Sequence, residues 1–150
     1  MNTKLVSGLD VVSRARLVTI SADALLVDAA KLLSDTHVSL VVVCNADGAM
    51  VGVITKTDIV QQIGRCAESA CTTAAALVMT RDITYCRPTD DLHDVLSMMA
   101  NLGFVHVPVV DGHFKPLGVV NARDALRALM AEEKYESSLL RDYIMGIGYR

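Results

Sequence analysis

Aromatic side chains are scarce in this chain. It has no tryptophan, two phenylalanines and four tyrosines among its 150 residues, although just over half of the residues are hydrophobic. The core must therefore be built from Val, Leu, Ile, Ala and Met, a composition that suits helices packed against a sheet. A chain of this length has the size of one ordinary domain and can bury a sizeable core.

A net positive charge and long apolar runs are also missing. The formal net charge is −3, which argues against a nucleic-acid-binding protein that works by broad neutralisation of phosphates. No apolar run approaches the roughly 20 residues that a membrane span needs, and residues 1–16 lack the apolar region of a secretory signal. We therefore expect a cytoplasmic protein that binds neither nucleic acid nor a membrane, while a small anionic ligand in a local pocket stays compatible with the composition.

The cysteines and the motifs give no sign of a metal site or of catalysis. Cys44, Cys66, Cys71 and Cys86 form no Cys-x-x-Cys pair, so we expect reduced thiols. A zinc site from Cys66, Cys71 and a distant histidine is an alternative, but the spacing matches no ligand template. The chain has no Gly-x-Ser-x-Gly elbow, no P-loop and no His-Glu-x-x-His. We expect no metal site and no enzymatic activity.

The chain does contain an internal repeat. Residues 52–58 (GVITKTD) recur as residues 118–124 (GVVNARD), an offset of 66 positions. At this offset residues 17–64 align with residues 83–130 without a gap, and apolar positions fall mostly on apolar positions. The sequence therefore predicts two copies of one structural unit.

Each unit has the pattern β-α-β-β-α. Short β-branched runs predict strands, apolar residues at helical spacing predict helices, and an Asp-Gly pair between two apolar runs predicts a hairpin. The predicted strands are residues 17–20, 39–44, 51–54, 83–86, 105–110 and 117–120, and the predicted helices are residues 25–35, 57–63, 92–101 and 122–130. A sheet of three short strands is marginal alone, which is a physical reason for the unit to occur as a pair.

The domain organisation follows from the repeat. We expect the first repeat over residues 8–64, a helical linker over 65–78, the second repeat over 79–130 and a helical tail over 131–150. The linker is rich in alanine and lacks proline, and residues 131–144 place apolar side chains on one face of a predicted helix.

The start of the last helix in each unit brings polar groups together. Thr55 or Asn121 can cap the helix, and Asp58 or Asp124 lies in its first turn. Capping and the helix dipole alone account for such an aspartate, at about 0.3–1 kcal/mol. Each of these helix starts also carries a cation, Lys56 or Arg123, which is a candidate contact for an anionic group.

The chain resembles a tandem pair of CBS domains, the Bateman module. The resemblance rests on residues 41–58 in the first copy, and on residues 106–111 and 118–124, with the lead-in 78–82, in the second. It covers roughly residues 8–130. It implies a stand-alone CBS domain-containing protein with an α/β (α+β) fold, in which two β-α-β-β-α repeats pack as a pseudo-two-fold disc, with a C-terminal helix added.

The resemblance also implies a ligand. CBS pairs bind adenosine compounds in two clefts between the repeats, so it implies AMP, ADP, ATP, NAD or S-adenosylmethionine as ligand and no required cofactor. The aspartate that holds the ribose hydroxyls in the family corresponds to Asp58 and Asp124, and a carboxylate can accept two hydrogen bonds from a vicinal diol. The family's small hydroxyl residue corresponds to Thr55, whereas Asn121 departs from the pattern. His106 stands where the family often places a base facing the phosphates, and the first copy has no base at this place.

The two clefts are therefore predicted to differ. The first cleft holds Thr55 and Asp58, and the second holds Asn121 and Asp124. The opposite lead-ins, residues 13–15 and 79–81, should lie against the adenine of the clefts. We expect the first cleft to draw on Thr80, Arg81 and His106, and the second on Ser13 and Ser39. The first cleft is expected to be the better nucleotide site.

These features predict a regulatory module that senses an adenine nucleotide. We expect a homodimer formed through the four repeat helices, and a change in what a partner protein recognises when the ligand binds. Two alternatives stay open: a ligand-independent dimerisation or scaffold module, which Asn121 favours, and a regulatory fragment of an inosine monophosphate dehydrogenase-like enzyme.

Overall fold

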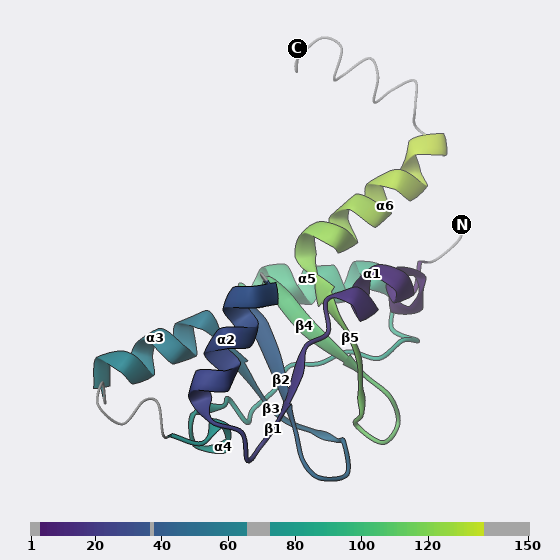
Figure 1. The fold of residues 1–150 in the computed structure, drawn as a ribbon. Helices are drawn as coiled ribbons and strands as arrows, with labels where there is room; N and C mark the ends of the chain where they lie inside the picture. Colours follow the sequence, from purple (N-terminus) through teal and green to yellow (C-terminus); the bar gives the residue numbers. More distant parts are fainter. Residues whose placement is uncertain (1–3, 37, 66–72, 137–150) are drawn as a thin grey trace.

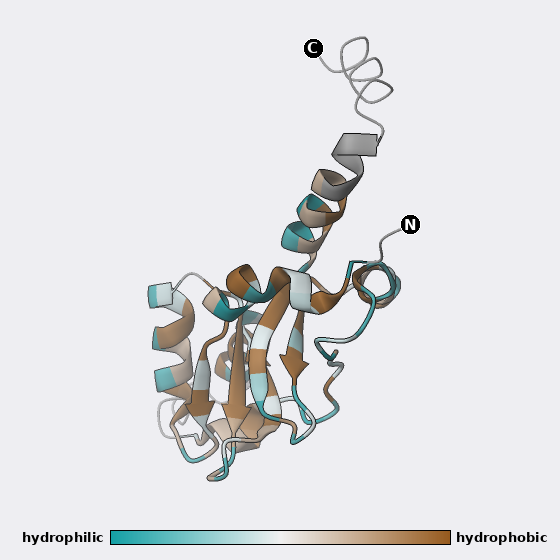
Figure 2. Ribbon diagram, turned by 90° about the vertical axis from the view of Figure 1, so that its right-hand side faces the viewer, coloured by the Kyte–Doolittle hydropathy of each residue, from teal (hydrophilic) through white to brown (hydrophobic). Residues whose placement is uncertain are grey.

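Two small sheets lie side by side in the middle of the protein, with helices around them (Figure 1). The structure, a computed structural model, describes residues 4–36, 38–65 and 73–136. The strands carry the most hydrophobic residues, whereas the helices alternate hydrophobic and polar faces (Figure 2). This mixed arrangement of helices and small sheets confirms the predicted fold class.

The first repeat forms a three-stranded sheet in the order β1-β2-β3, in which β1 pairs with β2 in parallel and β2 pairs with β3 antiparallel. Alternate residues of β2 point to opposite sides, so Val41 and Val43 face the helices of this repeat while Val42 faces the second repeat. The elements of this repeat are β1 (Thr19–Ser21), α2 (Leu26–Thr36), β2 (Leu40–Cys44), β3 (Met50–Thr55) and α3 (Lys56–Arg65).

The second repeat keeps the hairpin but has no first strand. Its elements are α5 (Leu92–Leu102), β4 (His106–Val110), β5 (Pro116–Asn121) and α6 (Ala122–Glu136). The predicted strand over residues 83–86 is wrong, because only Cys86 pairs with β4, through a single bridge to Val109. In the first repeat the N–H of Val42 donates to Val18 at 2.9 Å. The equivalent residue in β4 is Pro108, which has no N–H, so this ladder hydrogen bond is lost.

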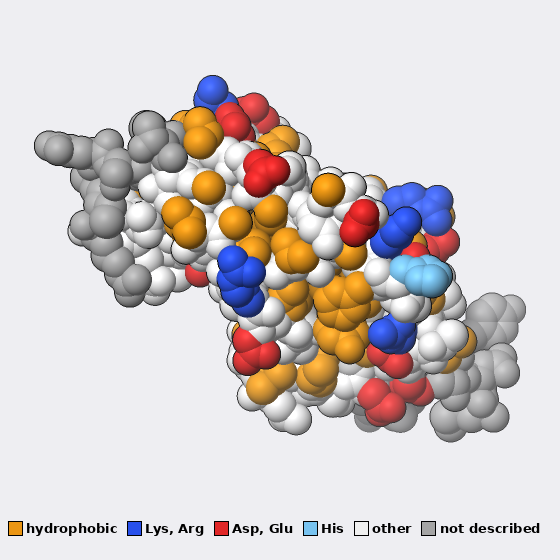
Figure 3. Space-filling view, turned by 90° about the horizontal axis from the view of Figure 1, so that it is seen from below, with side chains coloured by type: hydrophobic (Ala, Val, Ile, Leu, Met, Phe, Trp, Pro, Cys, Tyr) orange, Lys and Arg blue, Asp and Glu red, His pale blue; other side chains and the backbone are white. Residues whose placement is uncertain are grey.

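Side-chain contacts hold the segment where the ladder is incomplete. The rings of Tyr85 and Phe114 meet edge to face with centroids 4.7 Å apart, and the Arg87 guanidinium lies 5.7 Å from the Tyr85 ring centre. Phe114 belongs to the β4–β5 turn, at the end of the protein where both hairpins turn (Figure 1). Seen from this end, hydrophobic side chains gather in the middle of the face with charged side chains around them (Figure 3).

The linker and the tail are only partly described. The predicted linker over residues 65–78 contains the end of α3 and the short helix α4 (Ala75–Val78), while residues 66–72, with Cys66 and Cys71, lie outside the described residues. The zinc site considered for these two cysteines therefore lies outside them as well. Helix α6 continues without a break to Glu136, so the described start of the predicted tail extends the last repeat helix. It projects away from the body of the protein (Figures 1 and 2).

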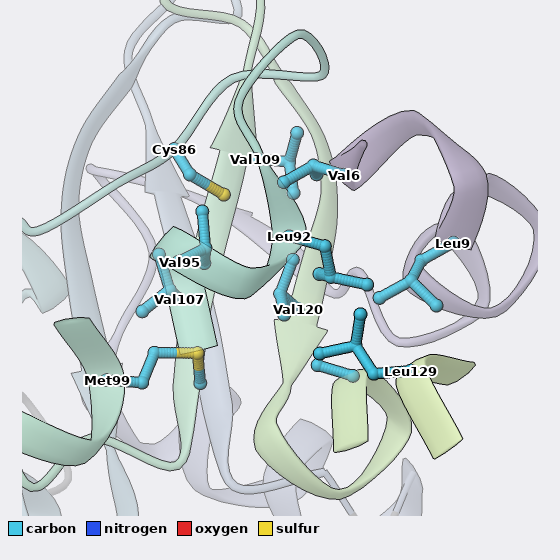
Figure 4. Packing of buried hydrophobic residues seen from close by; sticks show 11 residues of the cluster. Val6, Leu9, Cys86, Leu92, Val95, Met99, Val107, Val109, Val120 and Leu129 are labelled. Atoms are coloured by element: carbon cyan, nitrogen blue, oxygen red, sulfur yellow. The ribbon is translucent and has the colours of Figure 1, made fainter. Parts of the chain in front are cut away.

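Each repeat receives the segment that precedes the other repeat in the sequence. The N-terminal segment, η1 (Val6–Leu9) and α1 (Asp10–Ala15), packs on the second repeat, where Val6 and Leu9 join its buried cluster (Figure 4). The segment before the second repeat packs on the first, where Ala75 joins the cluster of that repeat. Neither core is complete without the exchanged segment.

The exchange is fixed by backbone hydrogen bonds from equivalent helix starts. The first N–H of α2, from Leu26, donates to the carbonyl of Thr73 at 2.7 Å, and the first N–H of α5, from Leu92, donates to the carbonyl of Lys4 at 2.8 Å. The opening N–H groups of a helix have no partner within the helix itself. Each segment therefore satisfies a helix end of the other repeat.

The glycine that opens the repeated motif is required by close approach. A Cβ on Gly118 would lie 2.8 Å from the backbone carbon of Ser13 and 2.7 Å from its Oγ. A Cβ on Gly52 would overlap the side chain of Met79, the residue equivalent to Ser13 in the other copy. Only a glycine at each position lets the exchanged segment lie against the strand.

Replacement of Gly118 by alanine should destabilise the fold. The added methyl group meets backbone, which cannot turn aside, so we expect Gly118→Ala to lower the free energy of unfolding by about 1–3 kcal/mol in urea titrations. Gly64→Ala is the matched control, because a Cβ there meets nothing within 4 Å. In a helix this control should be neutral or stabilising by up to about 1 kcal/mol. Equal stability of the two variants would contradict the close-approach argument.

Candidate functional site

A pocket of about 500 Å³ lies between the two repeats, at the start of α3. This volume falls within the range of about 300–1,000 Å³ that is usual for small-molecule sites. Its apolar walls come from both repeats: Leu40, Val53, Ile83, Phe104, Val105 and Pro108. It is the first cleft predicted from the sequence, because Thr55 and Asp58 line its edge.

Thr55 and Asp58 cap α3 reciprocally. The backbone N–H of Thr55 donates to Asp58 Oδ2 at 2.9 Å, and the N–H of Asp58 donates to Thr55 Oγ1 at 3.3 Å. This is a capping box, in which two side chains satisfy two backbone donors at a helix start. It holds the carboxylate in one orientation, and among the described residues no group donates to its second oxygen, Oδ1. That oxygen is placed to accept hydrogen bonds from a ligand.

His106 joins the two repeats at the back of the pocket. Its Nδ1 lies 3.2 Å from Ser39 Oγ, and its Nε2 lies 2.9 Å from Asn121 Nδ2. The Asn121 Oδ1 accepts the N–H groups of Arg123 and Asp124 at 2.9 and 3.1 Å, which fixes the orientation of the amide. The Asn121 NH₂ must therefore donate to Nε2, and His106 is the neutral tautomer with its proton on Nδ1.

The environment of His106 supports the neutral form. Burial lowers the pKa of His106, and the nearby Arg16 charge lowers this pKa further, against an opposing effect of Asp124. His106 lines the first cleft as expected, but it presents no positive charge to it. Ser39, which we expected in the second cleft, lines the first cleft instead because it meets His106 there.

At the predicted second cleft Asp124 forms an ion pair within the chain. Asp124 is 6 % exposed, and Arg16 donates to both of its carboxylate oxygens, from Nη2 to Oδ1 at 3.0 Å and from Nε to Oδ2. This bidentate contact raises the pKa of the Arg16 guanidinium. Ser13 is buried nearby, where its Oγ donates to the Asp10 carbonyl at 3.4 Å. The carboxylate predicted to hold a second ribose already has a partner.

Sequence reasoning missed Arg16 and Asp82. The two residues stand at equivalent positions, since an offset of 66 places Arg16 on Asp82. Arg16 reaches Asp124, whereas Asp82 lines the first cleft. The opposite charges at one repeat position were a visible signal in the sequence.

The remaining predicted residues divide between the pocket and the surface. Lys56 and Thr80 line the first cleft. Arg81 is not among the described residues that line it, because its Nη2 donates to the Ala76 carbonyl at 3.1 Å. Arg123 is exposed at the start of α6, where its backbone N–H is capped by Asn121.

Removal of Arg16 should destabilise the protein more than removal of its neighbour Arg127. Arg16→Ala removes the bidentate partner of the buried Asp124 carboxylate, and we expect a loss of about 2 kcal/mol in urea unfolding. This is less than the roughly 3–5 kcal/mol typical of fully buried pairs, because the Arg16 side chain is 34 % exposed.

Arg127→Ala is the matched control. Its guanidinium lies 3.9 Å from Asp124 and is 72 % exposed, so its loss should cost less than about 1 kcal/mol. A double variant, Arg16→Ala with Asp124→Asn, should regain part of the lost stability, since no unpaired charge is then buried. Equal costs of the two single arginine substitutions would show that the ion pair does not stabilise the second cleft.

Similar folds occur in several solved structures. A CBS-domain-containing protein from Agrobacterium tumefaciens is 25 % identical, with a TM-score of 0.73 over 84 % of this chain and 99 % of that one. The CBS domain pair of protein MJ0100, solved with 5′-methylthioadenosine and S-adenosyl-L-methionine, is 22 % identical, with a TM-score of 0.73 over 87 % of this chain and 99 % of that one.

A third structure, the cytosolic domain of the Mg²⁺ channel MgtE in complex with ATP, is 21 % identical, with a TM-score of 0.64 over 76 % of this chain and 45 % of that one. The model of the CBS domain family matches residues 8–65 and again residues 74–131. The chain therefore belongs to the CBS domain family and carries two CBS domains in tandem.

Proposed function

We propose that this protein is a regulatory module that binds an adenosine compound in the first cleft. The observation that carries the proposal is the pocket of about 500 Å³ between the repeats, with the oriented carboxylate of Asp58 at its edge. Two proteins of the same fold were solved with adenosine compounds, which supports a ligand of this class.

The lining offers polar and apolar groups that suit the two parts of a nucleoside. Asp58 Oδ1 can accept hydrogen bonds from the ribose hydroxyls, while Oδ2 keeps the helix capped. The apolar walls, among them Leu40 and Val53, can bury the base. Lys56 and Thr80 stand at the rim as further polar contacts.

The proposal assigns one ligand to each chain. In the second cleft the equivalent carboxylate, Asp124, is bound by Arg16 and buried. A ribose entering there would have to displace a bidentate charged contact, which costs more than a neutral hydroxyl can return. Only the first cleft keeps its aspartate available.

Ligand titration tests the proposal. Thermal-shift and calorimetric titrations with AMP, ADP, ATP, NAD and S-adenosylmethionine should find at least one ligand with a stoichiometry of one per chain. At a hundred times the dissociation constant, such a ligand stabilises the protein by about 2.7 kcal/mol. Asp58→Ala should weaken binding at least tenfold, because the ribose loses its charged acceptor.

A matched control comes from another helix start. Asp28 lies exposed in the first turn of α2 and does not line the pocket, so Asp28→Ala should keep the affinity. No binding of any of these compounds would favour the scaffold alternative. Binding that survives Asp58→Ala unchanged would leave the function intact and refute the role of Asp58.

We also propose that the module forms a homodimer through its repeat helices. Val60 on α3 and Leu126 on α6 occupy the same position of the two repeats, and they are 67 % and 51 % exposed. Two related apolar positions on one molecule suit an isologous interface, in which each copy offers the same surface.

Sedimentation tests the dimer. The protein should sediment at twice its 16.1 kDa mass at micromolar concentration, and the double variant Val60→Glu with Leu126→Glu should sediment as a monomer. Leu77→Glu is the control, because Leu77 is 80 % exposed on α4, which is not one of the four repeat helices of the proposed interface. A wild-type monomer, or a dimer that the double variant leaves intact, would contradict the proposal.

The proposed role is regulation rather than catalysis. A ligand held between the repeats favours one packing of the pair, and a partner protein recognises that packing. We place the module in the cytoplasm, since Cys44 and Cys86 are both free thiols. A regulatory fragment of a larger enzyme would use the first cleft in the same way.

A further inference from the structure

The charged side chains of the first cleft are mostly negative. Among the described residues that line it, Asp58 and Asp82 carry carboxylates and Lys56 carries an ammonium group. Lys56, on the first residue of α3, and Asp82 are both exposed, whereas Asp58 is half-buried. Two carboxylates against one ammonium group make the described lining net negative.

The other cations near the cleft are turned away or already paired. Arg81 donates to the Ala76 carbonyl, and Arg16 is bound to Asp124 in the second cleft. At the start of α3 the N–H groups of Thr55 and Asp58 are bonded internally, and the Asp58 carboxylate offsets the helix dipole. A polyphosphate in this cleft would therefore find little positive charge.

His106 does not supply the missing charge. The Asn121 amide is oriented by the helix donors that it caps, and it donates to Nε2 of His106. A proton on Nε2 would point at the Asn121 NH₂, so the contact keeps the ring neutral. Asn121, which departs from the repeated motif, thus keeps His106 neutral and leaves the first cleft without a positive charge from this ring.

The two repeats place opposite charges at one structural position. Arg16 and Asp82 are equivalent in the repeat, and each lies close to a cleft. Arg16 neutralises the aspartate of its own cleft, whereas Asp82 adds a second carboxylate to the cleft of Asp58. Electrostatic complementarity discriminates between ligands chiefly through such like-charge contacts.

We propose that the first cleft selects adenosine compounds whose 5′ substituent is neutral or cationic, such as a thioether or a sulfonium, and rejects 5′-phosphates, with Asp82 as the specificity-determining residue. This inference rests on the proposed function and specifies its ligand. The same fold holds 5′-methylthioadenosine with S-adenosylmethionine in one structure and ATP in another, so the ligand is chosen by the lining residues rather than by the fold.

Calorimetric titration with four probes tests the selection. The probes are 5′-methylthioadenosine, S-adenosylmethionine, AMP and ATP, measured on the complete chain at pH 7.5 and low salt. We expect the first two to bind at least tenfold more tightly than AMP and ATP. Asp82→Asn should reduce the preference for 5′-methylthioadenosine over AMP about fivefold, because it removes one of the carboxylates that would repel the phosphate.

A control with the same change of charge separates the local effect from the net charge. Asp47 lies exposed in the β2–β3 turn, so Asp47→Asn should leave the affinity ratio unchanged. Tighter or equal binding of AMP or ATP by the wild type overturns this inference and leaves the proposed function standing. If Asp82→Asn does not change the ratio of AMP to 5′-methylthioadenosine affinity, this inference is likewise overturned and the proposed function stands. Failure of all four probes to bind overturns the proposed function, and this inference with it.

Discussion

The exchange of lead-in segments is the constraint on which the rest of the structure depends. The first N–H of α2 and of α5 finds its partner in a carbonyl that precedes the other repeat, at Thr73 and Lys4. A buried helix end without a partner costs about 1–3 kcal/mol, so neither repeat is complete by itself. The same docking presses the exchanged segments onto Gly52 and Gly118, and it carries Asp82 to the first cleft and Arg16 to the second.

A symmetric backbone here supports two different sites. The capping box of Thr55 and Asp58 leaves one carboxylate oxygen of the first cleft available. In the second repeat Asn121 caps α6 without help from the aspartate, so Asp124 is released to pair with Arg16. One change of capping residue thus separates a carboxylate that can hold a ligand from one that holds the fold together.

The sequence alone predicted the features that depend on local pattern. The constant offset, the β-α-β-β-α order of the first repeat and the place of Thr55 and Asp58 follow from periodicity and turn chemistry, and the structure has them. The Arg16–Asp124 pair joins residues 108 positions apart, so it could be recognised only once the packing of the repeats was known. The lost first strand of the second repeat could have been foreseen, because Pro108 stands where a ladder donor is needed.

For a ligand bound in the first cleft as proposed, His106 is the contact that connects the cleft to α6. Its ring lies in the wall of the cleft, and it is hydrogen-bonded to the amide that caps α6. That helix projects from the body of the protein, so a movement of its first turn would also move its far end, which lies away from the cleft (Figure 1). A ligand shifts an equilibrium only by its difference in affinity for the two states. A ligand that displaces His106 removes a hydrogen-bond partner of the amide that caps α6, whereas one that leaves the ring in place keeps this contact between cleft and helix.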